Sequence, residues 1–399
     1  MNKRKRHYQK HKRGSIVGLV LIIGVCLAII GWGMLNMGFG SRVNSAKNTT
    51  TVIAREAADA GLTEALHLLN QRLLSGSTDF TGIEATDVQL NPPFSQPTYS
   101  YVAEPNGIAT VLIHSTGYCR DQVRKVHAVT ALRSIWDEKF YFESGGEFGS
   151  GFTGDVIPPE SIIGFSVHTG SVGSGAVILH PNLLFDGEII VGPGGDPETV
   201  ISGKKSSIIN GPTYAASEDL EFPFKAVPDV IESTLPPSSG GITTIPAGMY
   251  GYPPISIGNS DKIYIDGAVT IVTDSVDIKN SGEIRILSGG SLALYVDGSF
   301  IANNGSYIYN DDMEAARMKI YGSENCTKIE IKNSGDFWGA IYAPNAHLEI
   351  KNSGSYIGGF NVDTVDIKHS GQLIFDASLS NPVEEPSYFT IQRWWEEAN

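Results

Sequence analysis

The strongest feature of the hydropathy pattern is one long apolar stretch near the amino terminus. Residues 14–41 form a run of 28 positions without Asp, Glu, Lys, Arg or His. A helix of that length rises about 40 Å, enough to cross a ~30 Å hydrocarbon core with some tilt. The stretch predicts a single transmembrane helix. A cleaved secretory signal is the competing interpretation, although its apolar region is usually only ~7–15 residues long.

Charge is distributed unevenly around this stretch. Residues 1–13 carry seven Lys or Arg and no acid, and we expect this basic stub to stay cytoplasmic because positive charge beside a span sets its orientation. The chain has a net charge of −14, so the +7 of the stub leaves −21 on the remaining residues. That acidic, extracytoplasmic part repels polyanions, which excludes nucleic acid as a partner and leaves the lipid bilayer as the partner of the span.

Residues 42–76 continue the helical pattern past the membrane. Apolar residues recur at steps of three or four and form one stripe, namely Ala58, Leu62, Ala65, Leu69 and Leu73. Ser75 and Gly76 end the pattern, and the β-branched Thr49–Thr51 weaken the helix where it leaves the lipid. The stripe packs either against the protein's own globular domain or against neighbouring subunits.

Residues 77–139 change to a β pattern. Three strand-like segments centre on residues 99–103, 108–115 and 123–132. Pro-Asn-Gly at 105–107 separates the first pair and residues 117–122 separate the second, which predicts an antiparallel meander. Such a small sheet needs the preceding helix to bury its apolar side.

The basic stub and the apolar helix are followed by the helical segment Ala54–Leu66 (AREAADAGLTEAL) and the strand segment Ile113–Gly117 (IHSTG). In these features the first 135 residues resemble PilX-type pilus-assembly proteins. The resemblance implies a type IV pilin-like fold, other pilin-like subunits as partners, and prepilin peptidase cleavage between Gly14 and Ser15. Mature type IV pilins generally place Glu at the fifth position after this cleavage, where the present chain has Leu19.

The carboxy-terminal part contains a repeated hexapeptide of the form [DE]-I-K-[NH]-S-G. Its four copies begin at residues 277, 330, 349 and 366, with separations of 53, 19 and 17 residues. Such periods indicate a solenoid of short coils, and 53 is close to three further steps. Strand alternation points one residue of each copy inward, namely Ile278, Ile331, Ile350 and Ile367. The flanking Lys and acidic residues then form compensating outward ladders, and Asn-Ser-Gly forms turns with Gly at positive φ.

The solenoid pattern predicts four segments after the meander. We expect first β-helix coils at 140–218, a Pro-rich loop at 219–241, the main β-helix at 242–380 and a tail at 381–399. Residues 150–380 resemble the β-helical carboxy-terminal domain that follows the PilX-type helix in many bacterial envelope proteins. Arg393-Trp394-Trp395 in the tail either stacks on a surface glycan or, as we expect, caps the open end of the β-helix.

Candidate catalytic and cofactor signals are weak. Residues 149–154 match G-x-G-x-x-G, but no helix pattern follows, and no P-loop, G-x-S-x-G, H-E-x-x-H or C-x-x-C is present. Isolated histidines occur along strands and turns and are expected to be surface or edge residues, namely His114, His127, His168, His180, His347 and His369. Four acids either bind Ca²⁺ on one solenoid face or only solvate it, namely Asp261, Asp266, Asp274 and Asp277. We therefore expect no cofactor.

Cysteine usage leaves the redox state open. Cys26 lies within the apolar stretch, so only Cys119 and Cys326 remain outside it, and these two either pair or stay as buried free thiols. Together the patterns predict a mainly β protein with one membrane helix, an extended amphipathic helix, a pilin-like meander and a β-helix. The predicted function is a non-enzymatic minor pilin-like subunit or assembly factor of the bacterial envelope. A membrane-anchored β-helix adhesin or carbohydrate-active enzyme is the alternative.

Overall fold

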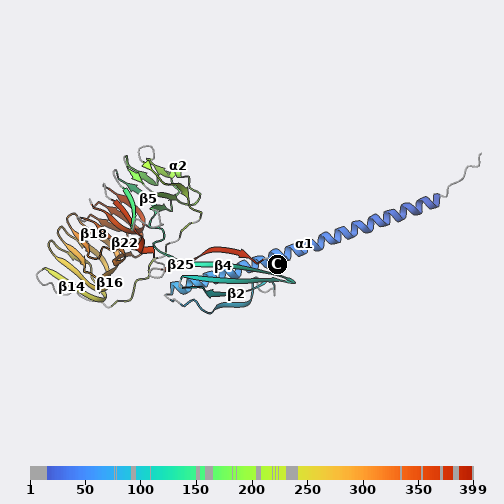
Figure 1. Ribbon diagram of the computed structural model, residues 1–399, viewed down its shortest axis with the longest axis horizontal. Coiled ribbons are helices and arrows are strands. Elements are labelled where there is room, and N and C mark those ends of the chain that lie inside the picture. The colour runs from blue at the N-terminus through green and yellow to red at the C-terminus, as the bar shows by residue number, and fades with distance from the viewer. Residues whose placement is uncertain are drawn as a thin grey trace, which may run out of the picture. The chain divides into compact units, whose positions relative to one another are not determined.

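The computed structural model confirms the mainly β fold class, with a long apolar helix, an antiparallel sheet and a β-solenoid (Figure 1). It describes residues 16–397 except 76, 78, 91–95, 108, 150–152, 158–164, 182, 186, 204–207, 218, 221, 223, 231–240, 333–334, 352–353, 369–371 and 381–385. Two compact units divide the chain. We call residues 1–132 with 388–399 the head unit, and residues 133–387 the solenoid unit.

The head unit consists of one helix and a five-stranded antiparallel sheet. Helix α1 spans Ile16–Leu74 without interruption, so the Thr49–Thr51 run does not break it. The sheet has the order β1-β2-β3-β4-β25, with bounds β1 Ile83–Gln89, β2 Thr98–Pro105, β3 Thr110–Cys119, β4 Gln122–Ser134 and β25 Pro386–Glu396. The predicted meander therefore corresponds to β2–β4, and the sheet gains a further strand at each edge.

Helix α1 packs on this sheet through small residues. Its buried stripe contains the residues expected from the sequence, namely Ala58, Leu62, Ala65, Leu69 and Leu73, together with Ala54 and Ala57. A Cβ on Gly117 of β3 would lie 2.0 Å from the Ala54 carbonyl oxygen. A Cβ on Gly61 of the helix would lie 2.4 Å from Ser115 Oγ. At Gly117 the two backbones approach so closely that the position requires glycine, whereas at Gly61 the helix meets the side chains of Ser115 and Tyr99.

The prediction of a turn over residues 117–122 is wrong for its first residues. Gly117 pairs with Arg124 inside the β3–β4 ladder, and β3 continues to Cys119. The turn is shorter and centres on Arg120, whose φ is 57°, and Asp121. Gly117 is therefore explained by helix packing and not by turn geometry.

The carboxy-terminal strand also corrects a prediction. Residues 381–399 were expected to cap the β-helix, but β25 forms the edge of the head sheet beside β4, where Glu397 N donates to Lys125 O at 3.1 Å. Phe389 of β25 is buried and meets Phe80 edge to face, with 4.8 Å between ring centroids. Asn70 of α1 accepts a hydrogen bond from Phe389 N at 2.6 Å. The strand's apolar anchor and its backbone partners thus belong to the head core.

The solenoid unit contains two blocks of parallel strands. The first block comprises β5 Phe140–Phe148, β6 Thr153–Ile157, β7 Ser166–Thr169, β8 Val177–Leu179, β9 Leu184–Phe185, β10 Glu188–Val191, α2 Pro197–Val200, β11 Ile201–Ser202, β12 Ile208–Ile209 and β13 Thr213–Ala215. The second comprises β14 Ile242–Tyr252, β15 Ile255–Ile257, β16 Lys262–Ile278, β17 Glu283–Ile286, β18 Ser291–Ala302, β19 Tyr307–Asn310, η2 Ala315–Arg317, β20 Met318–Gly322, β21 Lys328–Ile331, β22 Phe337–Ile350, β23 Tyr356–Ile367, β24 Gln372–Asp376 and η3 Ala377–Ser380.

The coils do not stack in the order of the chain. Strand β5 of the first coil pairs in parallel with β23 of the last, with Phe140 opposite Phe360, and β6 pairs with β24. The first block stacks away from this junction through β7 and β10, whereas the second block approaches it from β14 through β22. The first and last coils are therefore neighbours, and the chain enters and leaves the solenoid in the middle of the stack.

This order requires the Pro-rich segment to return along the stack. Its described residues do so: the Phe222 ring lies 4.3 Å from that of Tyr141 in β5, and Lys225 Nζ lies 5.8 Å from the ring of Tyr321 in β20. Val227 and Val230 then lie beside Tyr252 at the end of β14. We call residues 219–230 the strap.

Candidate assembly site

The first candidate for function is the part of α1 that its own domain leaves uncovered. Large apolar side chains between Val20 and Phe39 are exposed over half or more of their surface. Among the described residues, α1 is the one helix long and apolar enough to span a membrane. Exposed apolar surface of this extent needs lipid or another apolar helix around it. The amino-terminal half of α1 is thus a candidate single-pass anchor.

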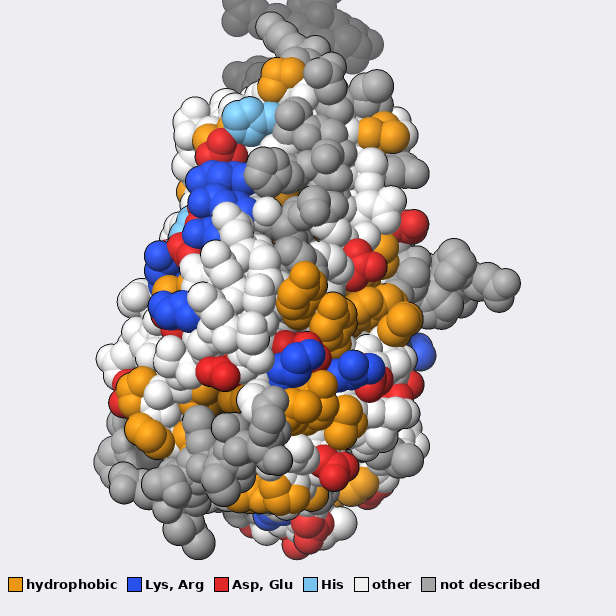
Figure 2. Space-filling model, turned by 90° about the vertical axis from the view of Figure 1, so that its left-hand side faces the viewer, with side chains coloured by type: hydrophobic (Ala, Val, Ile, Leu, Met, Phe, Trp, Pro, Cys, Tyr) orange, Lys and Arg blue, Asp and Glu red, His pale blue; other side chains and the backbone are white. Residues whose placement is uncertain are grey.

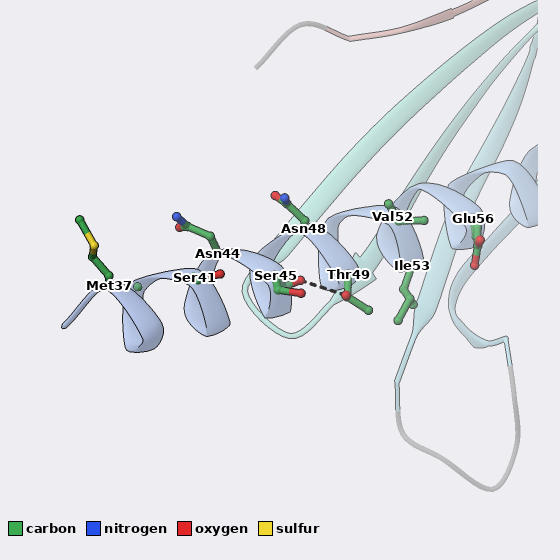
Figure 3. A pocket seen from close by; sticks show the side chains of 10 residues that line it. Met37, Ser41, Asn44, Ser45, Asn48, Thr49, Val52, Ile53 and Glu56 are labelled. Carbon is green, nitrogen blue, oxygen red and sulfur yellow. Dashed lines mark hydrogen bonds between the residues drawn. The ribbon is translucent and has the colours of Figure 1, made fainter. Parts of the chain in front are cut away.

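A polar surface follows directly after the apolar segment. Figure 3 shows side chains between Met37 and Glu56 projecting from α1, among them Ser41, Asn44, Ser45 and Asn48. Glu56 is the first acidic residue of the whole chain. The three threonine hydroxyls bond back to carbonyl oxygens one turn earlier, for example Thr49 Oγ1 to Ser45 O at 2.9 Å. These bonds satisfy the hydroxyls within the helix, so the Thr run leaves no unpaired hydroxyl in α1.

The outer edge of the head sheet is held by opposite charges and stacked rings. Glu396 lies 3.5 Å from Arg124 and 3.8 Å from Arg55, and Glu397 lies 3.0 Å from Lys125. The hydrogen bond from Lys125 lowers the pKa of Glu397. The Trp395 ring stacks on that of His127 with 5.4 Å between centroids. The Arg393-Trp394-Trp395 segment therefore fixes β25 to the sheet.

Histidines 114 and 127 form a cross-strand pair on the same sheet. They are directly opposite in the β3–β4 ladder, with their Nδ1 atoms 2.5 Å apart. Burial lowers the pKa of His127, and the nearby His114 ring adds to this effect. The two rings are therefore in direct contact through their Nδ1 atoms, an arrangement that the isolated positions in the sequence did not reveal.

The repeat-core isoleucines lie in one buried ladder. Ile278, Ile331, Ile350 and Ile367 are each at most 4 % exposed. Ile331 pairs with Ile350, and Ile350 with Ile367, but Ala302 stands between Ile278 and Ile331. The 53-residue separation therefore contains two long coils and not three short ones. The intermediate coil, which passes through Ala302, lacks the hexapeptide. At the turns, Ser281 takes positive φ in place of Gly282, whereas Gly335 takes it as predicted.

Outward charges of the same repeats form an ion-pair network. Glu349 lies between three lysines, at 3.3 Å from Lys332 and 3.1 Å from Lys368, and in contact with Lys351. Burial raises the pKa of Glu349, but the hydrogen bonds from these lysines outweigh it and lower the pKa to about 2. Figure 2 shows basic side chains aligned in a column beside acidic ones on a face of the molecule. Glu349 is thus held as a carboxylate by Lys351 of its own coil and by Lys332 and Lys368 of the neighbouring coils.

The remaining candidate residues are dispersed. His168 and His180 pair with Glu138 and Glu147 at 2.9 and 2.6 Å, and His347 contacts Thr364. Across the described part of the chain, no three His, Cys, Asp or Glu residues are grouped to hold a metal ion, the four solenoid aspartates included. Cys119 and Cys326 are buried free thiols, and burial raises the pKa of Cys326 to about 11. Gly14, Ser15, His369 and residues 150–152 of the glycine motif lie outside the described residues.

Comparisons with known proteins give limited information. A family described as a domain of unknown function (DUF7305) matches residues 205–382, which includes the second block of coils. No curated protein matches the chain. Among solved structures, the competence-associated pilin ComZ from Thermus thermophilus aligns with 12 % identity over 88 % of this chain and 98 % of that one, with a TM-score of 0.26. At that TM-score the alignment supports no statement about this chain.

Proposed function

We propose that the chain is a membrane-anchored, pilin-like structural subunit of the bacterial cell envelope. The observation that carries the proposal is helix α1, whose exposed apolar half continues without interruption into a half that is buried under a small antiparallel sheet. The resemblance of residues 54–66 and 113–117 to PilX-type proteins supports it, because Gly61 and Gly117 lie where the helix packs closely on the sheet.

The location of the anchor follows from the charges around it. The basic residues 1–13 precede the span and the first acid is Glu56, so by the positive-inside rule the amino terminus lies in the cytoplasm, and the head sheet and the solenoid unit lie outside. Cleavage between Gly14 and Ser15 by a prepilin peptidase would remove this stub. The partners of the mature protein are the lipid bilayer and other pilin-like subunits, which contact the uncovered face of α1.

The size of the solenoid unit favours a minor position in an assembly. Residues 133–387 are inserted between β4 and β25 of the head unit, so the insertion is larger than the head itself. Subunits in the body of a fibre repeat at short axial intervals and leave little room for such an insertion. Leu19 in place of Glu also removes the charge that pairs with a neighbouring amino terminus. A tip or assembly role without catalysis fits both features.

Quantitative mass spectrometry of sheared filaments tests this role. We expect a mature amino terminus at Ser15 and a copy number far below that of the major subunit. Equal copy numbers would contradict the minor role. Complete absence from filaments, with an uncleaved chain in the membrane fraction, would favour a membrane-held adhesin instead.

A further inference from the structure

A groove of about 1250 Å³ lies on the solenoid unit between the strap and one corner of the coils. The strap contributes Val227 and Val230 to one wall. The coils contribute Tyr252, Pro253, Pro254, Thr273, Asp274, Tyr295, Asp297 and Ser323, among others. None of the residues assigned to the anchor or the head sheet takes part, so this groove is independent of the proposed assembly role.

The groove crosses four successive coils at one corner. Tyr252 pairs with Thr273, Thr273 with Val296, and Val296 with Gly322. Neighbouring coils are ~4.8 Å apart, so the floor repeats its backbone over about 14 Å. The register of β16 and β18 shifts directly after Thr273, where Asp274 and Asp297 project from adjacent coils. The groove therefore presents a carboxylate at each of two consecutive steps.

The charged groups of the groove are the carboxylates of Asp274 and Asp297, which accept hydrogen bonds. Asp297 accepts from Ser323 Oγ at 2.5 Å and from Asn325 Nδ2 at 3.1 Å, and the bonds from Ser323 and Asn325 lower its pKa. Asp274 is exposed on β16. Among the described residues that line the groove there is no Lys or Arg. Such a lining repels polyanions and suits a ligand that supplies repeated hydroxyl donors.

The aromatic groups of the groove are held in fixed orientations. Tyr252 is stacked on Tyr250 with an interplanar angle of 7°, and Tyr295 on Tyr321 with ring centroids 4.8 Å apart. Tyr252 is 5 % exposed and closes the floor, so the half-buried Tyr295 is the ring that a ligand can contact, and an ordered ring loses little conformational entropy on contact. Fixed apolar surfaces beside carboxylate acceptors complement sugar rings, which combine apolar faces with hydroxyl edges.

An extended peptide fits this groove less well. Strand β16 is already paired with β14 on one side and β18 on the other, and β18 is paired with β16 and β20. A peptide strand would therefore find no free backbone ladder to join at the floor. We propose that the groove binds a neutral linear oligosaccharide across successive coils, with Asp274 and Asp297 accepting hydrogen bonds from its hydroxyl groups.

Binding to defined hexasaccharides tests the proposal. The full chain in detergent micelles is titrated with cellohexaose, xylohexaose, mannohexaose and chitohexaose, and with hexagalacturonate and hexalysine as anionic and cationic probes. We expect at least one neutral hexasaccharide to bind and both charged probes to bind more weakly. The exposed Asp274→Ala variant should weaken binding about tenfold or more, because a hydrogen bond to a charged group is lost.

Asp266→Ala is the matched control. Asp266 is also an exposed aspartate of β16, but it lies outside the groove, so its removal should change the affinity less than about twofold. Unchanged melting of both variants shows that folding is intact. Failure of all four neutral sugars to bind, equal effects of the two substitutions, or preferential binding of hexalysine or hexagalacturonate would each overturn the proposal.

Discussion

The head unit and the solenoid unit bury their cores in different ways. In the head, one helix lies on one sheet, and the contact depends on single positions such as Gly61 and Gly117, where any side chain would collide. In the solenoid, each coil repeats the contact of the coil before it, so that Ile331, Ile350 and Ile367 perform the same task in succession. The head is thus specified by a few unique contacts, and the solenoid by a repeated one.

The two units also differ in how far apart their partners are in sequence. Neighbouring coils of the main block pair residues that are close in sequence, 19 positions apart for Ile331 and Ile350 and 17 for Ile350 and Ile367. The head sheet is completed by β25, whose Phe389 contacts Asn70 across 319 residues. Folding of the head therefore depends on the carboxy terminus, a dependence that the repeated contacts of the solenoid do not share.

Removal of the Phe389 side chain should destabilise the head alone. Phe389→Ala leaves a cavity beside Phe80 and is expected to cost about 3–5 kcal/mol. Hydrogen exchange on the full chain is the measurement: amides of β1–β4 should lose protection while those of β22 and β23 keep theirs. Ile391→Ala, at a 41 % exposed position of the same strand, is the control and should have little effect. Earlier loss of protection in the solenoid would instead support a capping role.

A charge placed inside the isoleucine ladder should destabilise the solenoid unit. Ile278→Asp buries an unpaired carboxylate at a fully buried position and is expected to cost about 3 kcal/mol or more. Its neighbour Lys279 is largely exposed, so Lys279→Gln should cost under about 1 kcal/mol. Thermal melting of the two variants provides the comparison. Similar shifts would show that the inward and outward faces are assigned wrongly.

An Arg substitution should impair membrane insertion in the amino-terminal half of α1 and not in the other half. Ile23→Arg places a charge in the apolar segment and is expected to cost ~2.5–3.5 kcal/mol of insertion free energy. Val52→Arg lies on the same helix beyond that segment, at a 55 % exposed position, and should insert normally. Membrane fractionation with protease protection distinguishes them. Full and correctly oriented integration of Ile23→Arg would contradict the single-span assignment.

The contrast between the units explains what the sequence reveals. The hexapeptide repeat predicts the ladder of Ile331, Ile350 and Ile367 because the same local pattern occurs in each of these three coils. It did not predict the stacking of β5 on β23, since the coils at Phe140 and Phe360 share no repeated motif. Nor did it reveal Ala302, which occupies the ladder position without the surrounding hexapeptide.

In the head, the sequence predicts the local elements and not the long-range pairing. The 3.6-residue stripe identifies the buried face of α1, and the alternation between residues 99 and 132 identifies β2–β4. The sequence of β25 does not indicate which strand it pairs with, because an added strand pairs with whichever edge of a sheet is still unpaired. The groove beside the strap was also missed, since it depends on a segment that returns along the stack.

Close packing in the head should make it sensitive to a single methyl group. Gly117→Ala places a Cβ 2.0 Å from the Ala54 carbonyl oxygen, so helix and sheet must separate, at a cost of about 1–3 kcal/mol. Gly173→Ala in the solenoid is the control, because a Cβ there meets only Ser171 Oγ at 3.4 Å. Denaturant unfolding monitored for each unit measures the difference. Equal stability of the two variants would refute the close approach of α1 and β3.

The smallest expected effect is a loss of folding stability at low pH, and it should arise from the ion pairs of Glu349 in the solenoid unit. Glu349 has a folded-state pKa of about 2 against an ordinary value of 4.5, so its ion pairs stabilise the folded state fully above pH 4.5. This contribution is lost as the pH falls from 4.5 towards 2. Solvent screening of the partly exposed lysines reduces the loss to about 1–2 kcal/mol.

The acid effect is measured as the difference in unfolding free energy between the wild-type chain and Glu349→Gln at several pH values. Glutamine keeps the size of the side chain but does not titrate, so the variant should be less stable at pH 6 and equal to the wild type near pH 2. The head unit, which does not contain this ladder, should unfold with the same pH dependence in both chains. A constant difference across the range would mean that the three lysines do not hold Glu349 in its charged form.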